Sequence, residues 1–356
     1  MIDEPVLHRY HPTDRAEVFD LLRASLPEET SARLIAQWRW KFEANPFTPP
    51  EGPIGHLIRI GRELAALVAG FRLKMSIGGI EFLAESWGDW VVHPDYRRRK
   101  LWQIVGVPQA AVPILISWGR SFSPRYGIMM GWTAEPLTPL LRVLDPEPLV
   151  EHLTHSPRLA SISAGASAAT RVVAGFLTRT RSDRNRNVVR FEAFDDRVDA
   201  LSQRALRVEQ AMVVRDQRYL NWRYCQRPDA SYTLFGVEHE SELAGFLVSR
   251  VGMHQGIRWG YLVDFLAAEN SRDVLSSLVE AALDEFRRVG VAAVTCYATD
   301  PATRRMLFRR GFVPIRQRDP IHFAHYVQGK RTDLAKFTPL KRWYLTMGDS
   351  DFEMSF

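Results

Sequence analysis

Asp89-Trp-Val-Val-His-Pro-Asp-Tyr-Arg-Arg-Arg-Lys-Leu-Trp-Gln103 is the stretch of this chain that decides its fold. The apolar residues before Pro94 predict the end of a buried strand, and the basic residues after it predict a turn that opens a helix. The first N–H groups of a helix have no intrahelical partner, and the helix dipole adds about half a positive charge there. The sequence therefore predicts an anion site at this turn.

The predicted strand that leads into this stretch, residues 80–93, carries three carboxylates. Glu81, Glu85 and Asp89 lie four residues apart, so regular alternation would place all three on one face. A salt bridge or a solvent-facing position is a structural interpretation open to Glu85 and to Asp89. A bulge in the strand would change which of them points to the site.

Residues 91–102 resemble the acyl-CoA signature of the GNAT superfamily of N-acyltransferases. In that signature a V-x-P-x-Y-R strand end leads into a Q/R-x-x-G-x-G/A loop that grips the pyrophosphate, and Arg97 takes the first loop position. Lys100 and Trp102 stand where the family usually has glycine, which lets backbone approach phosphate closely. The alternative is an ordinary surface turn. The resemblance implies that acetyl-CoA or another acyl-CoA is the co-substrate, and that it is bound by Val91, Val92, Arg97, Arg98, Arg99, Lys100, Leu101, Trp102 and Gln103.

Composition frames this interpretation. A chain of 356 residues with 46% apolar residues predicts two cores, and its charge of +6 suits a phosphate-bearing ligand without predicting nucleic-acid binding. Cys225 and Cys296 have no metal or redox spacing, the histidines form no metal-binding pattern, and serine-hydrolase, Walker and Rossmann motifs are absent. With no export signal and no apolar run long enough to span a bilayer, we expect a cytoplasmic protein.

An internal repeat supports two domains. Trp38-Arg39-Trp40 is echoed 184 residues later by Trp222-Arg223-Tyr224, Glu63 by Glu242 after 179, and Asp89 by Asp264 after 175. A shrinking offset is what shorter loops in a second copy would produce. We expect a mixed α/β protein of two tandem GNAT-like domains, each a mostly antiparallel sheet flanked by helices. The predicted boundaries are 1–155, a linker helix and basic loop at 156–187, and 188–356.

The second copy departs from the resemblance where the chemistry would lie. Leu307-Phe308 and Gly311-Phe312 match a segment in which relatives often carry a proton-donating tyrosine, and Phe308 cannot donate. Its strand end, residues 267–273, carries two acidic side chains that would repel pyrophosphate, so we expect one cofactor per chain. The linker, a solvated connection, has apolar and basic residues that would also suit an anionic membrane surface.

The resemblance implies transfer of an acyl group to an amine. In that family a carboxylate on the central strand often serves as the general base, so the resemblance implies Glu85 as the first candidate for this role and Asp89 as the second. Residues 219–224 and 343–351 look like those of members linked to bacterial surface-polysaccharide synthesis, which makes a sugar amine an expected acceptor, with the 222–224 segment either lining its site or serving a structural role. Two alternatives stay open: a non-catalytic scaffold in polysaccharide assembly, and an aminoacyl transferase of the Fem type. Residues 101–119 are expected to form the helix after the loop.

Overall fold

The chain forms two compact units, and neither is a continuous piece of it. The computed structural model describes residues 4–101, 112–120, 130–154, 188–268, 272–329, 334 and 336–350. Unit 1 contains Met1–Pro136, Arg218–Ser231 and Ile321–Thr338, and unit 2 contains Leu137–Gln217, Tyr232–Pro320 and Pro339–Phe356. This differs from the consecutive domains predicted at 1–155 and 188–356, because each half of the chain gives segments to the unit built mainly from the other. The predicted linker at 156–187 lies outside the described residues.

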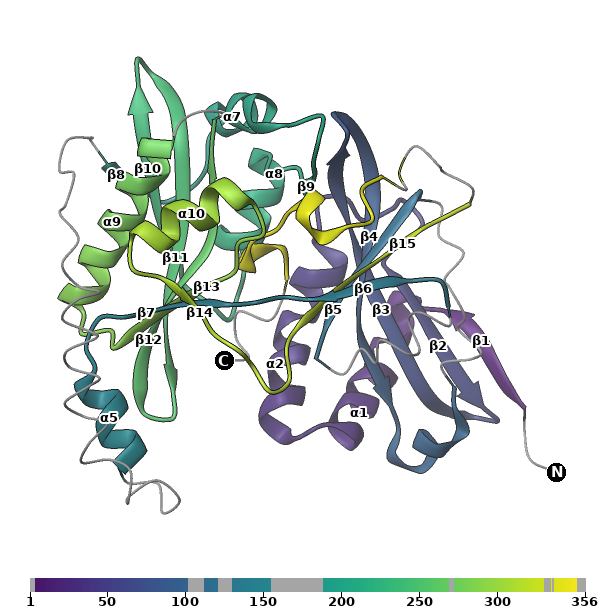
Figure 1. The fold of residues 1–356 in the computed structure, drawn as a ribbon. Helices are drawn as coiled ribbons and strands as arrows, with labels where there is room; N and C mark the ends of the chain where they lie inside the picture. The colour runs from purple at the N-terminus through teal and green to yellow at the C-terminus, as the bar shows by residue number, and fades with distance from the viewer. Residues whose placement is uncertain are drawn as a thin grey trace. The chain divides into compact units, whose positions relative to one another are not determined.

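Unit 1 is a mixed sheet whose strand order is β1-β2-β3-β4-β5-β15-β6 (Figure 1). Neighbouring strands are antiparallel except for β4 and β5, which are parallel. Its elements are β1 (Pro5–Arg9), η1 (Pro12–Asp14), α1 (Arg15–Ser25), α2 (Glu28–Trp38), the π-helix η2 (Arg39–Glu43), β2 (Ile54–Ile60), β3 (Glu63–Ile77), β4 (Ile80–Val92), the 3₁₀ helix η3 (Pro94–Arg99), β5 (Ile114–Gly119), β6 (Thr133–Pro136), the π-helix η4 (Asn221–Cys225) and β15 (His322–Val327).

Alternation along the strands gives this sheet two buried faces. Leu67 and Val91 pack with apolar residues of α1 and α2, so these helices cover one face. Val68, Trp87 and Leu115 belong to a second cluster on the opposite face. The two faces of β4 therefore have different neighbours, which decides where its charged side chains go.

Residues 114–119, within the region where the sequence predicts a helix after the basic turn, form a strand. Residues 114–119 form β5, and all of its side chains are buried. A short continuous apolar run fits a strand covered on both faces as well as a buried helix, and periodicity alone does not separate the two. The prediction of a helix over 101–119 is therefore wrong at 114–119, while its residues 102–111 lie outside the described residues.

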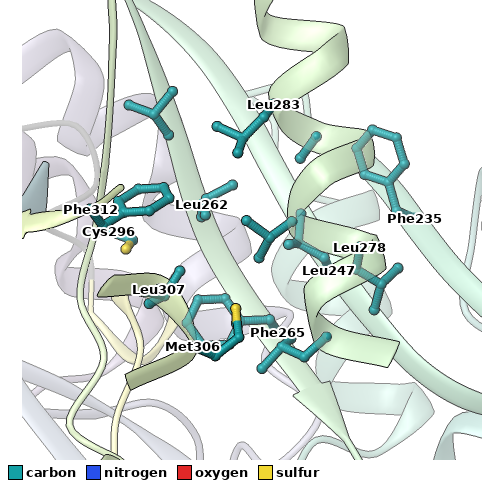
Figure 2. Packing of buried hydrophobic residues seen from close by; sticks show 14 of the residues in the cluster. Phe235, Leu247, Leu262, Phe265, Leu278, Leu283, Cys296, Met306, Leu307 and Phe312 are labelled. Atoms are coloured by element: carbon teal, nitrogen blue, oxygen red, sulfur yellow. The ribbon is translucent and has the colours of Figure 1, made fainter. Parts of the chain in front are cut away.

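Unit 2 is a seven-stranded sheet with the order β14-β7-β13-β12-β11-β10-β8. Helices α9 and α10 pack apolar side chains such as Leu278 and Leu307 onto Phe235, Leu247 and Leu262 of the strands (Figure 2). Its elements are β7 (Leu140–Val143), α5 (Glu147–Thr154), β8 (Val188–Phe191), α7 (Arg197–Ala205), β9 (Ala211–Val213), β10 (Thr233–His239), β11 (Glu242–His254), β12 (Ile257–Ala267), α9 (Arg272–Arg288), β13 (Ala293–Cys296), α10 (Pro301–Arg309), β14 (Val313–Pro314), η5 (Leu340–Arg342), β16 (Trp343–Tyr344) and η6 (Met347–Asp349). Helix α8 (Gln217–Leu220) follows α7 and β9 in the chain.

The two sheets repeat one topology and complete it with exchanged strands. In unit 1, β15 from the C-terminal half lies between β5 and β6; in unit 2, β7 from the N-terminal half lies between β13 and β14. Both sheets also have a parallel pair at the corresponding place, β4–β5 and β12–β13. The predicted fold class, a mixed α/β protein of two similar mixed sheets flanked by helices, is confirmed.

The repeat has a different register at its tryptophans from the one predicted. Both π-helices lie in unit 1, where the Trp40 and Trp222 rings stack at 5.0 Å between centroids. The Trp40 Nε1 group donates to the Trp222 carbonyl at 2.7 Å, and the Trp222 Nε1 group donates to the Trp40 carbonyl at 2.9 Å. This reciprocity makes Trp222 the counterpart of Trp40 and not of Trp38. The sequence predicted Trp38 because the motif alone does not distinguish the two tryptophans of the first copy.

No helix in the described part of the chain is long and apolar enough to cross a membrane. The described residues also contain no group of three or more His, Cys, Asp or Glu side chains able to hold a metal ion.

The exchanged strand carries a histidine that should make unit 1 sensitive to acid. His325 on β15 is 5% exposed, and burial lowers its pKa from 6.5 to about 4. A depressed histidine pKa gives stability that is complete above pH 6.5 and is lost as the pH falls toward 4.

We expect His325→Gln to remove about 2 kcal/mol of the stability difference between pH 7.5 and pH 5, measured by urea unfolding at both values. Comparing the pH dependence rather than the absolute stability separates this effect from any packing defect. The control is His239→Gln, at the exposed end of β10. An unchanged pH dependence in His325→Gln would contradict the assignment.

Candidate active site in unit 1

The central strand β4 is bulged at its third candidate carboxylate. Leu67 pairs with Val91 and Ala69 pairs with Gly88, so Asp89 and Trp90 together oppose the single residue Val68. Asp89 has a φ of 41°, in the left-handed region that costs a non-glycine residue about 1 kcal/mol. The bulge reverses the alternation, so side chains before and after it that would share a face in a regular strand do not.

Glu85 lies before the bulge and is 2% exposed. Its carboxylate accepts hydrogen bonds from the Trp87 Nε1 group at 3.2 Å and from the Arg72 Nε group at 3.3 Å. Trp87 belongs to the cluster on the face opposite α1 and α2, so Glu85 lies on that face. Burial raises the pKa of Glu85 above its ordinary value, although the Arg72 guanidinium acts in the opposite direction. The site therefore holds a buried carboxyl group whose proton affinity is increased.

Asp89 lies in the bulge and pairs with a different element. Its Oδ2 atom is 2.5 Å from the Nζ atom of Lys41 in η2, and both side chains are largely buried. The Lys41 ammonium also lies 5.3 Å from the Phe42 ring centroid and 5.9 Å from that of Phe71. Because η2 directly follows α2, Asp89 points to the helix-covered face, away from Glu85. The common face expected for a regular strand therefore does not include Asp89, and the bulge is the reason.

The basic turn after β4 is a 3₁₀ helix anchored at several points. The His93 ring accepts from the Asp95 N–H at 3.4 Å, which caps the start of η3. The Tyr96 hydroxyl donates to the Glu63 carboxylate, and the Arg97 Nη2 group donates to the Ser25 carbonyl at the end of α1 at 2.8 Å. Leu101 is 3% exposed and packs with the apolar residues at the start of β3. The turn is thus held on both sides of its cationic residues.

The cationic side chains of the turn face outward. Arg98, Arg99 and Lys100 are exposed; the Arg99 guanidinium lies 5.3 Å from the Tyr96 ring centroid, and Arg98 and Lys100 contact no other charged group among the described residues. Lys100 has φ 50° and ψ 40°, the left-handed conformation that favours glycine. The family's preference for glycine at this position is therefore matched by the backbone, though not by the residue. Trp102 and Gln103 lie outside the described residues.

Strand β4 separates from β5 just before this turn. The two strands pair in parallel only from Ala84–Ile114 to Trp87–Ser117, and β4 then continues to Val92. Val91 and Val92 pair with β3, so within the described residues their strand has no partner along its β5-facing edge. Backbone N–H and C=O groups along such an edge need partners from elsewhere. The predicted cofactor residues thus border a backbone edge that can accept an extended polar ligand.

Sequence reasoning missed the residues that orient the two carboxylates. Arg72 lies directly opposite Glu85 in the β3–β4 register, and Lys41 lies 48 residues before Asp89. A cationic residue at the paired position of a hairpin could have indicated the first pair. Nothing in the sequence indicated the Lys41–Asp89 pair, because this pair joins the end of a helix to a bulge in a strand.

The 222–224 segment has the structural role that sequence analysis kept as an alternative. Trp222, Arg223 and Tyr224 are 2%, 2% and 4% exposed. The Arg223 guanidinium lies 5.8 Å from the ring centroids of Trp40 and Tyr224. These side chains are part of the packing of unit 1.

Comparison with solved structures identifies the fold. No protein-family model matches the chain, and no curated protein does. A probable N-acyltransferase from Enterococcus faecalis V583 is similar with a TM-score of 0.58 and 12% identity, covering 94% of this chain and 74% of that one. Saccharomyces cerevisiae N-myristoyltransferase with bound myristoyl-CoA has a TM-score of 0.57 and 11% identity, covering 92% of this chain and 79% of that one. A GCN5-related N-acetyltransferase from Kribbella flavida is similar with a TM-score of 0.57 and 14% identity, covering 92% of this chain and 71% of that one.

These similarities extend over nearly all of the chain and fit its two similar sheets. At identities of 11% to 14%, these similarities show the fold alone. The chain has the fold of the GCN5-related N-acyltransferases, with two copies of the GNAT sheet in tandem.

Proposed function

We propose that unit 1 binds acyl-CoA and transfers its acyl group to an amine. The observation that carries this proposal is the separation of β4 from β5 after Trp87, directly before the basic turn η3. The pantetheine arm of CoA contains two amide groups, and a strand edge with no partner among the described residues offers the N–H and C=O groups that amides bind. Solved structures with this fold include one with bound myristoyl-CoA, which supports the choice of ligand.

The turn supplies the charge for the diphosphate. Arg98, Arg99 and Lys100 are exposed and adjacent, and the bond from Arg97 to the Ser25 carbonyl fixes the turn beneath them. Guanidinium groups form strong charge-assisted hydrogen bonds with phosphate oxygens. In this proposal Val91 and Val92 hold the pantetheine, Arg97 positions the turn, and Arg98 to Lys100 bind the phosphates. Leu101, Trp102 and Gln103 complete the predicted loop.

Glu85 is the proposed general base. The amine nitrogen forms a bond to the thioester carbonyl carbon, Glu85 takes the amine proton, and the carbon–sulfur bond breaks to release the CoA thiolate. Burial raises the pKa of Glu85, which makes its carboxylate a stronger proton acceptor. Asp89 is the second choice because its carboxylate is already paired with the Lys41 ammonium. Holding amine and thioester together lowers the barrier further by removing entropy from the reaction step.

An amine of a sugar or polysaccharide precursor is the acceptor class that we propose to test first. The resemblance of residues 219–224 and 343–351 to members linked to surface-polysaccharide synthesis supports this choice. A cytoplasmic location belongs to the same proposal, because acyl-CoA is an intracellular co-substrate. A protein that binds no acyl-CoA would instead fit the scaffold alternative, and dependence on RNA would fit the aminoacyl transferase.

Reversing one charge of the turn should weaken cofactor binding. We expect Arg98→Glu to raise the Kd for acetyl-CoA or a longer acyl-CoA at least tenfold in titration calorimetry, because it removes one phosphate contact and adds repulsion. Arg98 suits this test better than Arg97, whose bond to Ser25 is structural. Arg305→Glu, an equal charge change at an exposed position of α10, should leave the Kd unchanged. Equal binding by Arg98→Glu, or no binding by the unaltered chain, would refute the cofactor site.

Removing the base should slow turnover without weakening cofactor binding. We expect Glu85→Gln to lower kcat about a hundredfold or more at an unchanged acyl-CoA Kd, measured by thiol release with a panel of amines. The kcat of the unaltered chain should rise with pH through a value above the ordinary pKa of glutamate, since the base must be ionised. Glu81→Gln, which changes a more exposed carboxylate on the same strand, is the control. A large loss in Asp89→Asn with normal turnover in Glu85→Gln would move the role to Asp89.

A further inference from the structure

Unit 2 has the same strand separation that defines the proposed site of unit 1. Strands β12 and β13 pair in parallel only from Trp259–Ala293 to Leu262–Cys296, and β12 then continues to Ala267. Two residues after the last pair comes Asp264, just as Asp89 comes two residues after Trp87. A register shift beside Val248 marks a bulge here too. Unit 2 thus has its own opening beside a bulged strand, and its backbone edge needs partners.

The C-terminal segment, residues 343–350, contacts backbone groups on both sides of this opening. On the β12 side, the Tyr344 hydroxyl donates to the Phe265 carbonyl at 2.7 Å. On the other side, beyond β13, Thr346 forms an antiparallel bridge with Ala298, and the Thr299 N–H donates to the Leu345 carbonyl at 3.2 Å. Every residue from 343 to 350 is buried. The segment therefore connects the two strands where they no longer reach each other.

The buried Arg215 guanidinium links β12 to the C-terminal segment. Arg215 is fully buried; its Nε group donates to Asp264 at 2.9 Å, and its Nη2 group donates to Asp349 of the segment at 2.9 Å. The Thr346 hydroxyl donates to Asp264 Oδ1, also at 2.9 Å. Removing one partner of such a network leaves a buried charge without compensation. The segment is therefore held by the hydrogen bonds of its polar side chains as well as by the burial of its apolar ones.

We propose that the opening of unit 2 is a binding site for a peptide segment, that the chain fills it with its own residues 343–350, which form the strand β16 and the 3₁₀ turn η6, and that this occupation confines acyl-CoA to unit 1. A peptide and a pantetheine arm both carry amide groups, so they compete for the space beside the same strand edge. The last clause rests on the proposed function; the peptide site does not.

Cleavage of the folded full-length chain tests the site directly. A protease recognition sequence inserted at Pro339, which is exposed, allows the C-terminal fragment to be separated from the chain after folding. We expect the cut fragment to stay bound through size-exclusion chromatography, and to exchange slowly with a labelled synthetic peptide of residues 340–356. Prompt loss of the fragment from the cleaved chain of otherwise unaltered sequence would overturn the peptide site.

Substitutions in the same cleavable chain identify the contacts that matter. Thr346→Val, which removes the hydroxyl at nearly constant volume, should speed fragment exchange at least tenfold, and Thr346→Ser, which keeps the hydroxyl, should restore slow exchange. Lys341→Gln, an exposed change in the same fragment, should exchange like the unaltered sequence. Equal exchange rates for Thr346→Val and Lys341→Gln would show that the polar contacts do not hold the segment.

Calorimetry with the intact chain separates this inference from the proposed function. One bound acyl-CoA per chain agrees with both. Two bound equivalents would overturn the confinement of the cofactor to unit 1 while leaving acyl-CoA binding intact. No bound acyl-CoA would refute the proposed function and the last clause together, whereas fragment retention would still decide whether the peptide site exists.

Discussion

The constraint on which this molecule depends is the hydrogen-bonding demand of backbone where two parallel strands separate. A strand that leaves its neighbour keeps N–H and C=O groups that must find partners, because leaving a buried one unpaired costs about 1–3 kcal/mol. Both units meet this constraint at the same point of the same topology. In unit 2 the chain's own residues provide the partners. In unit 1 the corresponding edge leads into a cationic turn, which suits a ligand carrying both amides and phosphates.

The bulge in β4 decides how charge is distributed around that edge. A regular strand would put its three carboxylates on one face. With the bulge at Asp89, Glu85 is paired with Arg72 on one face, and Asp89 is paired with Lys41 on the other. The left-handed backbone of Asp89 is strained, and the ion pair offsets part of that cost. One extra residue in the strand therefore places the carboxylate proposed as the base and the carboxylate paired with η2 on different faces.

Exchanged segments make each unit depend on both halves of the chain. Strand β15 completes the sheet of unit 1, β7 completes that of unit 2, and η4 pairs with η2 inside unit 1 through the two tryptophans. Exchange closes sheet positions that would otherwise be exposed edges between β5 and β6 or between β13 and β14. It also ties the folding of the proposed site to residues more than two hundred positions away, such as His325.

The sequence by itself determined the local elements of this protein. Pro94, the apolar run before it and the arginines after it predicted a strand end and a basic turn, because these depend on the φ of proline and on nearby periodicity. The repeat predicted two similar sheets. Only the tertiary structure decided the bulge at Asp89, the partners Arg72 and Lys41, the exchanged strands, and the use of residues 343–350. Each of these is a contact between distant residues, chosen by which backbone edge and which buried charge still lacked a partner, and that is a property of the assembled sheets.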